Sequence, residues 1–362
     1  MMKNNSFVQR RTSLQKKLTF NQALLISSAS DIFYFSGFQF LVPEEREALL
    51  VVTKKSTYLI HSTFSPLLSD PTLTFLSSCH HSQLQKHFET IKKTHPALDT
   101  LIIDPDSFFF SEYQSLAKLG LTILQNCQQL TWPIRIKKDL SELKKIKASC
   151  HLAKKSLAQI WPQIKAGISE IELQKLLEAQ MISLGSTTPA FPTIIAFGKN
   201  TALPHHQPTK KILKKEMSVL IDFGATVDGY RSDMTRTFWF GDQPNAKFTK
   251  IKQSVDSAYQ QALKVIKTNL NEGQILLAKT VDQSARETIQ NDGFGPYFIH
   301  TTGHGVGLNI HEPPSLNWQN TQPIRSGMVI TIEPGIYLSN QFGYRHENTV
   351  YLSDDKIIEL TK

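Results

Sequence analysis

Cysteine is scarce in this chain of 362 residues, which contains only Cys79, Cys127 and Cys150. Three scattered cysteines fit reduced structural thiols better than a disulfide framework or a zinc finger. The sequence also lacks an uncharged apolar run of about 18 residues, the length that a membrane-spanning helix needs. Residues 1–17 are polar and basic, without the apolar core of a secretory signal. These absences predict a cytoplasmic protein with no membrane partner.

Acidic residues are in the minority: 31 Asp and Glu stand against 40 Lys and Arg, which gives a net charge of +9. A positive balance raises the question of a nucleic-acid partner. The lysines are dispersed, however, with small groups at 144–147 and 210–215, and no aromatic platform or recognition motif accompanies them. A solvated basic face is the better interpretation, and no nucleic acid is expected.

One segment of the C-terminal part predicts a hairpin that carries two carboxylates. Asp222 follows the apolar run 219–221, and Asp233 follows an Asp-Gly turn signal at 228–229. A turn at this point would place the two aspartates nearly opposite each other on neighbouring strands. Two bare carboxylates so placed repel each other unless a cation lies between them.

The same arrangement recurs downstream, where Glu333 and Glu347 flank a turn around residues 340–341, and His304 adds an imidazole between two glycines. Four carboxylates carry about −4 and two divalent cations +4, so a loaded site is near neutral. Oxygen-rich ligation with one imidazole suits first-row divalent ions better than a thiolate-preferring ion. The sequence therefore predicts two divalent metal ions, with Mn²⁺ or Co²⁺ favoured and Zn²⁺ or Fe²⁺ as alternatives.

These residues lie in ordered motifs that resemble those of the pita-bread metallopeptidases, a family that includes methionine aminopeptidases, prolidases, Xaa-Pro aminopeptidases and creatinases. The motifs are IDFG at 221–224, SDMTRT at 232–237, TGHGVGL at 302–308, IEPG at 332–335 and RHE at 345–347. The resemblance implies that Asp222 and Asp233 bind one metal. It also implies that His304 and Glu333 help to bind the other, and that Asp233 and Glu347 bridge both.

Two more histidines fit the family pattern without being expected ligands. His205 and His311 match histidines that contact the scissile peptide and the tetrahedral intermediate in relatives, and the Pro-His order favours His205 over the adjacent His206. His304 and His311 are an odd number of positions apart, so a flat strand would place them on opposite faces. The glycines between them are natural places for a bulge that reorients one of them.

The chain divides near residues 131–140, where Trp132-Pro133 is expected to interrupt regular structure. Before this point the sequence predicts a smaller α/β domain over residues 1–135, which resembles the N-terminal domain of prolidases and Xaa-Pro aminopeptidases. Its expected elements are buried strands at 23–26, 48–52 and 101–103 and a helix at 83–93.

Residues 136–362 are predicted to form the catalytic domain. A capping box at Ser169 opens one helix, and further helices are expected at about 141–165, 249–270 and 275–291. These helices alternate with the strand hairpins. The predicted fold class is α+β, a C-terminal pita-bread (creatinase/aminopeptidase) fold in which helices cover the outside of a curved antiparallel sheet.

The expected chemistry is metal-dependent peptide hydrolysis. Two cations lower the pKa of bound water from about 16 toward 7 and supply a metal-bridging hydroxide as nucleophile. Glu333 would shuttle its proton, while His205 and His311 stabilise charge on the carbonyl oxygen.

The predicted substrates are peptides with proline in second position. The N-terminal domain and the short connection from Glu333 to Glu347 resemble the proline-specific branches of the family. Neither Arg325 nor Arg345 is a clear partner for a dipeptide carboxylate, so an Xaa-Pro aminopeptidase is favoured over an Xaa-Pro dipeptidase (prolidase). A non-catalytic peptide- or nucleic-acid-binding scaffold is the alternative from another class, and a homodimer is left open.

Overall fold

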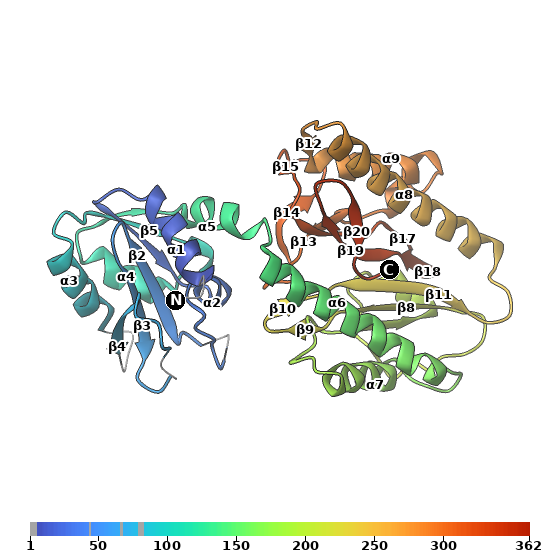
Figure 1. The fold of residues 1–362 in the computed structure, drawn as a ribbon. Helices are drawn as coiled ribbons and strands as arrows, with labels where there is room; N and C mark the ends of the chain where they lie inside the picture. Colours follow the sequence, from blue (N-terminus) through green and yellow to red (C-terminus); the bar gives the residue numbers. More distant parts are fainter. Residues whose placement is uncertain (1–5, 43–44, 66–67, 79–82) are drawn as a thin grey trace. The chain divides into compact units, whose positions relative to one another are not determined.

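The structure is a computed structural model that describes residues 6–42, 45–65, 68–78 and 83–362. The chain divides into two compact units, Met1–Arg135 and Ile136–Lys362 (Figure 1). Among the described residues, no helix has both the length and the apolar character that a membrane span requires. Cys79 lies outside the described residues, whereas Cys127 and Cys150 are free thiols whose pKa is raised by burial.

The N-terminal unit combines a mixed sheet with helices. Its elements are α1 (Ser6–Lys17), β1 (Gln22–Ile26), α2 (Ala29–Ser36), β2 (Ala48–Thr53), β3 (Thr57–Ser62), β4 (Thr74–Ser78), α3 (Leu84–Thr94), β5 (Thr100–Ile103), α4 (Phe110–Ala117), β6 (Thr122–Leu124) and α5 (Cys127–Arg135). The described strands follow the order β4-β3-β2-β1-β5-β6. The pairs β1–β2 and β2–β3 are antiparallel and the other pairs are parallel. The expected α/β organisation is confirmed.

The expected break at Trp132-Pro133 is wrong, because both residues lie within α5. Proline removes one amide donor from a helix and clashes with the preceding turn. The end of α5 is nevertheless held by its surroundings: buried Arg135 forms an ion pair with Asp31 at 2.7 Å, and its guanidinium carbon lies 4.4 Å from the centre of the Trp132 ring. These contacts, some of them distant in sequence, outweigh the local penalty of the proline.

The C-terminal unit is built on an antiparallel sheet. Its strands are β7 (Ile194–Phe197), β8 (Met217–Phe223), β11 (Met234–Phe240), β13 (Gly303–Gly305), β14 (Glu312–Leu316), β16 (Val329–Ile332), β19 (Glu347–Leu352) and β20 (Ile357–Glu359). The described strands follow the order β14-β13-β16-β19-β11-β8-β7, and β20 pairs with β19. Small pairs join β9 (Thr226–Val227) to β10 (Tyr230–Arg231), β12 (Leu276–Leu277) to β15 (Pro323–Ile324), and β17 (Gly335–Leu338) to β18 (Phe342–Arg345).

Two pairs of helices pack around this sheet. They are α6 (Leu140–Ile160) with α7 (Glu170–Ser183), and α8 (Ala246–Asn271) with α9 (Ala278–Asn291). Figure 1 shows the first pair on the side of β8 and the second pair on the side of β13 and β14. The helices predicted from the sequence are therefore present, and the α+β pita-bread fold is confirmed.

The turn and capping signals of the sequence form as local structure. Asp228 (φ 50°) and Gly229 (φ 81°) connect β9 to β10, and Asn340 (φ 60°) lies in the turn between β17 and β18. Positive φ at these positions is typical of tight hairpin turns. The capping box is present as well: Ser169 Oγ accepts from the Glu172 amide, and the Glu172 carboxylate accepts from the Ser169 amide.

Along β8, side chains alternate between the apolar core and the opposite face of the sheet, and Asp222 lies on that opposite face. Val219, Ile221 and Phe223 are fully buried in a cluster with residues of α6 and α7. Because successive side chains of a strand point to opposite faces, Asp222 lies on the face away from this cluster. The apolar packing of one face thus fixes the polar composition of the other.

Candidate metal centre

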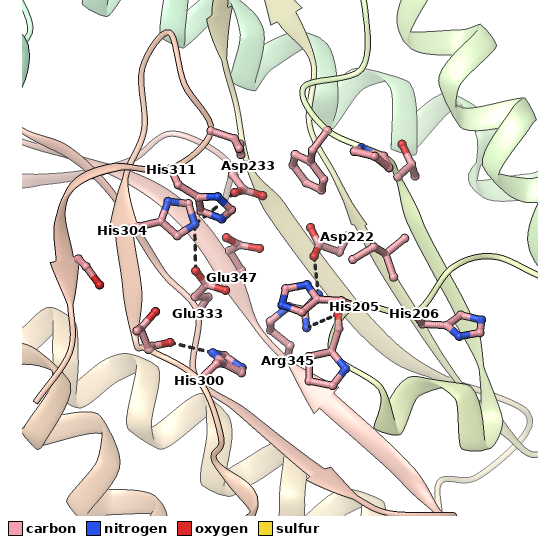
Figure 2. Close-up of a pocket in the computed structure, with 18 of the residues that line it drawn as sticks. His205, His206, Asp222, Asp233, His300, His304, His311, Glu333, Arg345 and Glu347 are labelled. Carbon is pink, nitrogen blue, oxygen red and sulfur yellow. Dashed lines mark hydrogen bonds and ion pairs between the residues drawn. The ribbon is translucent and has the colours of Figure 1, made fainter. Parts of the chain in front are cut away.

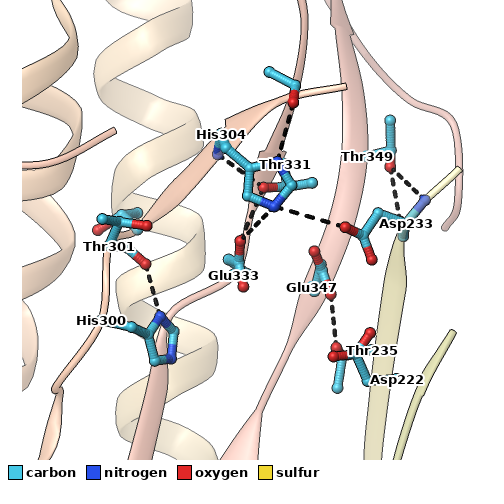
Figure 3. A network of polar contacts seen from close by, with 12 residues as sticks. Asp222, Asp233, Thr235, His300, Thr301, His304, Thr331, Glu333, Glu347 and Thr349 are labelled. Atoms are coloured by element: carbon cyan, nitrogen blue, oxygen red, sulfur yellow. Dashed lines mark hydrogen bonds and ion pairs between the residues drawn. The ribbon is translucent and has the colours of Figure 1, made fainter. Parts of the chain in front are cut away.

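Three adjacent strands place a row of polar side chains on one face of the sheet. Asp222 on β8 is paired with Thr235 on β11, and Thr235 is paired with Glu347 on β19. Paired residues of antiparallel strands point to the same face. Thr235 Oγ1 donates a hydrogen bond to Glu347 Oε2 at 2.6 Å (Figure 3). The register therefore brings together two carboxylates that are far apart in the sequence.

Asp233 directly precedes β11 and Glu333 directly follows β16, the two strands on either side of β19, and both residues are held by threonines. Thr349 Oγ1 donates to the backbone carbonyl of Asp233 at 2.7 Å, and Thr331 Oγ1 donates to Glu333 Oε1 at 3.1 Å (Figure 3). Thr331 and Thr349 are themselves paired across β16 and β19. One threonine pair thus sets the positions of both residues.

The two glycines around His304 allow β13 to lie close to both of its neighbours. A Cβ atom on Gly303 would lie 2.1 Å from the carbonyl oxygen of Thr331, and one on Gly305 would lie 2.4 Å from that of Pro313. Either contact would push the strands apart. Glycine at these positions permits the close approach that carries His304 to the carboxylates.

The structure brings all five predicted ligands to one cleft, with a volume of about 1090 Å³ (Figure 2). His304 Nε2 lies 3.2 Å from Glu333 Oε1 and 3.6 Å from Asp233 Oδ2. Single ligand atoms of Asp233, His304 and Glu347 lie within 4.8 Å of one another. Asp222 lines the same cleft from the β8 side.

The charge state of the carboxylates fits a site for divalent cations. Burial and then the charges of Glu347 and Asp222 raise the pKa of Asp233 well above its usual value. Burial and then the charge of Glu333 raise the pKa of Glu347 in the same way. Asp222 Oδ1 is buried and has no hydrogen-bond partner among the described residues. A lone pair without a partner and repelling carboxylates are both relieved by bound cations.

Glu333 and His304 form the shorter of the two ion pairs that His304 makes within the predicted ligand set. Burial raises the pKa of Glu333, but the hydrogen bond and the charge of His304 outweigh it and lower this pKa to about 2. Burial lowers the pKa of His304, but Glu333 outweighs it and raises this pKa above its usual value. An imidazole binds a metal in its neutral form, so cation binding would displace the His304 proton.

Arg345, at the end of β18, binds side chains in and around the candidate metal centre. Its guanidinium pairs with the Asp222 carboxylate, donates from Nε to Thr235 Oγ1 at 3.0 Å, and donates from Nη1 to the Tyr337 hydroxyl at 2.7 Å. Burial disfavours its charge, but Tyr337 and Asp222 outweigh burial and raise the pKa of Arg345 well above its usual value. The arginine therefore remains cationic.

The loop before β8 presents His205 to the centre and turns His206 away. Figure 2 shows His205 beside Asp222 and Arg345. The His206 side chain is buried, and its Nε2 lies 2.9 Å from Glu170 Oε2. The geometry thus agrees with the Pro-His order that favoured His205 from the sequence.

His311 lies against His304 in spite of their odd spacing. The centres of the two rings are 4.4 Å apart and the ring planes meet at 73°. The pairing of β13 with β14 shifts register between Gly303 and Gly305, which supplies the irregularity that the spacing requires. Burial, followed by the charge of His304, lowers the pKa of His311.

His300 is a cleft residue that the sequence reasoning missed. Its Nε2 lies 2.9 Å from the Tyr337 hydroxyl. Its Nδ1 lies 2.8 Å from the carbonyl oxygen of Thr301 (Figure 3). Burial lowers its pKa, so the ring is neutral at pH 7. The available signal was its position four residues before His304, in the segment that leads into the same motif.

Comparison with known proteins places the chain in a family. Residues 10–137 match the Creatinase/Prolidase N-terminal domain, and residues 144–354 match the Metallopeptidase family M24. The chain belongs to metallopeptidase family M24. An Xaa-Pro dipeptidase of Pyrococcus furiosus is 32% identical over 344 residues, which cover 94% of this chain and 93% of that protein. The family resemblance predicted from the motifs is confirmed.

Some relatives are named Xaa-Pro aminopeptidases and others prolidases. A putative Xaa-Pro aminopeptidase of Mycoplasma genitalium is 30% identical over 362 residues, which cover 98% of this chain and 97% of that protein. The solved prolidase of Pyrococcus horikoshii is 30% identical, with a TM-score of 0.85 and coverage of 99% and 98% of the two chains. Names alone therefore do not separate dipeptidase from aminopeptidase for this M24 chain.

We expect divalent cations to stabilise the folded M24 chain, and to do so more strongly as the pH rises. A ligand at 100 times its Kd that binds only the folded state adds about 2.7 kcal/mol. The raised pKa values of Asp233 and Glu347 mean that the metal-free folded chain holds protons more tightly than the unfolded chain, so its stability falls as the pH rises through these values. Cations meet less competition from protons over the same range.

The measurement is the Tm with Mn²⁺ and with a chelator, at about pH 5 and about pH 8. The difference between the two samples should be larger at the higher pH. A Tm that is unaffected by Mn²⁺, Co²⁺ and Zn²⁺ at both pH values would contradict a metal centre at this position.

Proposed function

We propose that residues 136–362 form a dinuclear metallo-aminopeptidase that hydrolyses the first peptide bond of substrates with proline in second position. The observation that carries this proposal is the convergence of Asp222, Asp233, His304, Glu333 and Glu347 on one cleft. The names of the relatives, Xaa-Pro dipeptidase and putative Xaa-Pro aminopeptidase, support the choice of an Xaa-Pro bond.

The proposed division of these ligands between two cations follows the resemblance of their motifs to those of the family. We assign Asp222 and Asp233 to one cation, His304 and Glu333 to the other, and Asp233 and Glu347 to both. When bound, two such ions lower the pKa of water and polarise a peptide carbonyl, which makes hydrolysis accessible near neutral pH. The ligand set of oxygens and one imidazole suits several first-row divalent ions. Mn²⁺ or Co²⁺ stays the preferred prediction, with Zn²⁺ or Fe²⁺ as alternatives.

The surrounding side chains handle protons and developing charge. Glu333 is ionised and lines the cleft, so it can accept the proton of the attacking water and pass it to the prolyl nitrogen, which leaves as a secondary amine. His205 lies beside Asp222, and His311 lies beside His304 (Figure 2). A carbonyl group bound between the two imidazoles would receive a hydrogen bond as negative charge develops on its oxygen.

The charges of the cleft favour substrates longer than dipeptides. Among the described residues that line it there is no lysine, and its arginine, Arg345, is already bound to Asp222 and Tyr337. Arg325 is exposed and lies outside the cleft lining. Part of the lining consists of neutral polar side chains, namely Ser315, Asn320 and Gln322. Neutral groups suit the main chain of a longer peptide better than the free carboxylate of a dipeptide.

We expect the metal-loaded protein to cleave Xaa-Pro-Yaa tripeptides and longer peptides at least as well as Xaa-Pro dipeptides. Replacing the second-position proline by alanine should lower kcat/KM by roughly 10- to 200-fold, the scale of lost apolar contacts in a shaped pocket. N-acetylation should suppress cleavage, because it removes the free amino group of the first residue, which an aminopeptidase is expected to recognise.

Initial rates on matched peptides, followed by chromatography, test these expectations. Hydrolysis confined to dipeptides would favour the Xaa-Pro dipeptidase alternative. Equal rates with proline and alanine would remove the proposed proline specificity.

The scaffold alternative receives less support, because each expected ligand position keeps a residue able to bind a metal. The cytoplasmic location and a homodimer stay predictions from the sequence.

A further inference from the structure

Glu170 is a buried carboxylate outside the metal centre, and the proposed reaction makes no use of it. It is the first residue of α7 and is 0% exposed. Its Oε1 atom accepts hydrogen bonds from the Phe197 amide and from Asn200 Nδ2, each at 2.8 Å. Both donors belong to the chain that approaches His205 from its N-terminal side.

The second oxygen of Glu170 binds the chain on the other side of His205. Glu170 Oε2 accepts from the Thr209 amide at 2.9 Å and from Thr209 Oγ1 at 2.6 Å, and it lies 2.9 Å from His206 Nε2. A single carboxylate therefore contacts the loop both before and after the histidine that faces the cleft.

The hydrogen bonds keep Glu170 ionised despite its burial. Burial raises the pKa of this carboxyl group, but the bonds from Thr209 and His206 and the backbone amides outweigh burial and lower it. The position at the start of α7 also favours negative charge, because helix N-termini carry a partial positive charge. A charged acceptor with five partners holds its donors more firmly than a neutral one would.

The loop held by Glu170 also contacts the strands of the metal centre. Thr201 Oγ1 accepts from the Gly343 amide at 2.8 Å, and the Pro204 carbonyl accepts from Arg345 Nη1 at 3.4 Å. Arg345 in turn pairs with Asp222. His205 follows directly after Pro204, so a displacement of the loop would move the imidazole relative to the ligands.

We propose that Glu170 is a positioning residue that acts through His205. By holding residues 197–200 and 206–209 together, it fixes the loop that presents His205 to the substrate. This inference rests on the proposed function, in which His205 stabilises charge on the scissile carbonyl. Loss of the hydrogen bonds to the Glu170 carboxylate should displace the His205 imidazole slightly while leaving the five proposed metal ligands in place.

The test compares Glu170→Gln with Glu172→Gln in the same helix. The substitution at Glu170 replaces one acceptor oxygen by an amide that faces the donors of the loop. Glu172 is exposed, and within the described part of the chain its carboxylate accepts from the amide and hydroxyl of Ser169. Its substitution therefore alters the cap of α7 and leaves the Glu170 carboxylate with its own partners. We expect kcat to fall by roughly 10- to 100-fold in Glu170→Gln. The metal content should be unchanged, and Glu172→Gln should behave like the unaltered protein.

A double-variant cycle distinguishes positioning from a general loss of structure. If Glu170 acts through His205, the variant that combines Glu170→Gln with His205→Ala should be about as active as His205→Ala alone. If the fold-decreases in kcat of the two single variants multiply in the double variant, at unchanged metal content, the inference is overturned and the proposed function stays intact. Full activity of His205→Ala would instead overturn the role of His205 and the inference with it.

Should Glu170→Gln fail to fold, Thr209→Val takes its place in the cycle, because it removes one of the five partners and keeps the charge. A decrease in kcat that is smaller than the one expected for Glu170→Gln, and that is absent when His205 is already alanine, supports the inference. A loss that persists in that background contradicts it.

Discussion

Replacing Glu347 by alanine should lower kcat/KM by roughly a thousandfold or more and reduce the bound metal. Its carboxylate is grouped with Asp233 and His304 within 4.8 Å and is assigned to both cations. Loss of a shared ligand forfeits several kcal/mol of charge stabilisation, and each 1.36 kcal/mol corresponds to a factor of ten in rate. Metal analysis after dialysis and initial rates on an Xaa-Pro-Yaa peptide measure the two effects.

The matched control is Glu287→Ala. Glu287 is exposed on α9 and accepts a hydrogen bond from Gln283 in the same helix. Its substitution removes the same charge and should leave metal content and activity unchanged. Glu347→Ala protein with full metal content and normal turnover would show that the shared ligand has been assigned incorrectly.

Replacing His205 or His311 by alanine should lower kcat by roughly a hundredfold while metal remains bound. The reason is that each imidazole is placed beside the ligand set as a donor to the developing oxyanion, and removal of one such donor costs about 10²- to 10³-fold. His151→Ala, at an exposed position of α6, serves as the control. Stoichiometric loss of metal in either active-site variant would mean that a ligand has been mistaken for a substrate contact.

Much of the centre could be predicted from the sequence because its signals are local. The turn at 228–229 and the apolar run that ends at Asp222 define one hairpin, and Glu333 and Glu347 flank the other. Each signal needs only neighbouring residues, and the order of the motifs identified the family. The catalytic fold and the proposed ligand set follow from these motifs and from the family that they resemble.

The supports of the centre depend on strand register, which the sequence does not reveal. Thr235 holds Glu347 because β11 is paired with β19 at that position, and Thr331 and Thr349 act as a pair for the same reason. Threonine is common in strands, so nothing local distinguishes these three residues. The sequence indicates Glu170 only as part of a helix start, since its partners lie 27 to 39 positions further along the chain.

The misplaced break at Trp132-Pro133 has a similar origin. Helix propensity treats proline as a break, but the contacts of Arg135 with Asp31 and Trp132 stabilise the end of α5. Asp31 is 104 positions away in the sequence, so the residues around Pro133 give no sign of that contact.

We propose that this chain acts as an Xaa-Pro peptidase through cations held by Asp222, Asp233, His304, Glu333 and Glu347. The most direct measurement is the rate of Xaa-Pro-Yaa cleavage during titration of the metal-free protein with Mn²⁺ or Co²⁺, with bound metal determined in the same samples. We expect no cleavage without metal and a rate that rises to a plateau as the bound metal approaches two equivalents per chain. Cleavage that persists after complete removal of metal, or no cleavage with any of Mn²⁺, Co²⁺, Zn²⁺ and Fe²⁺ at full occupancy, would contradict this proposal.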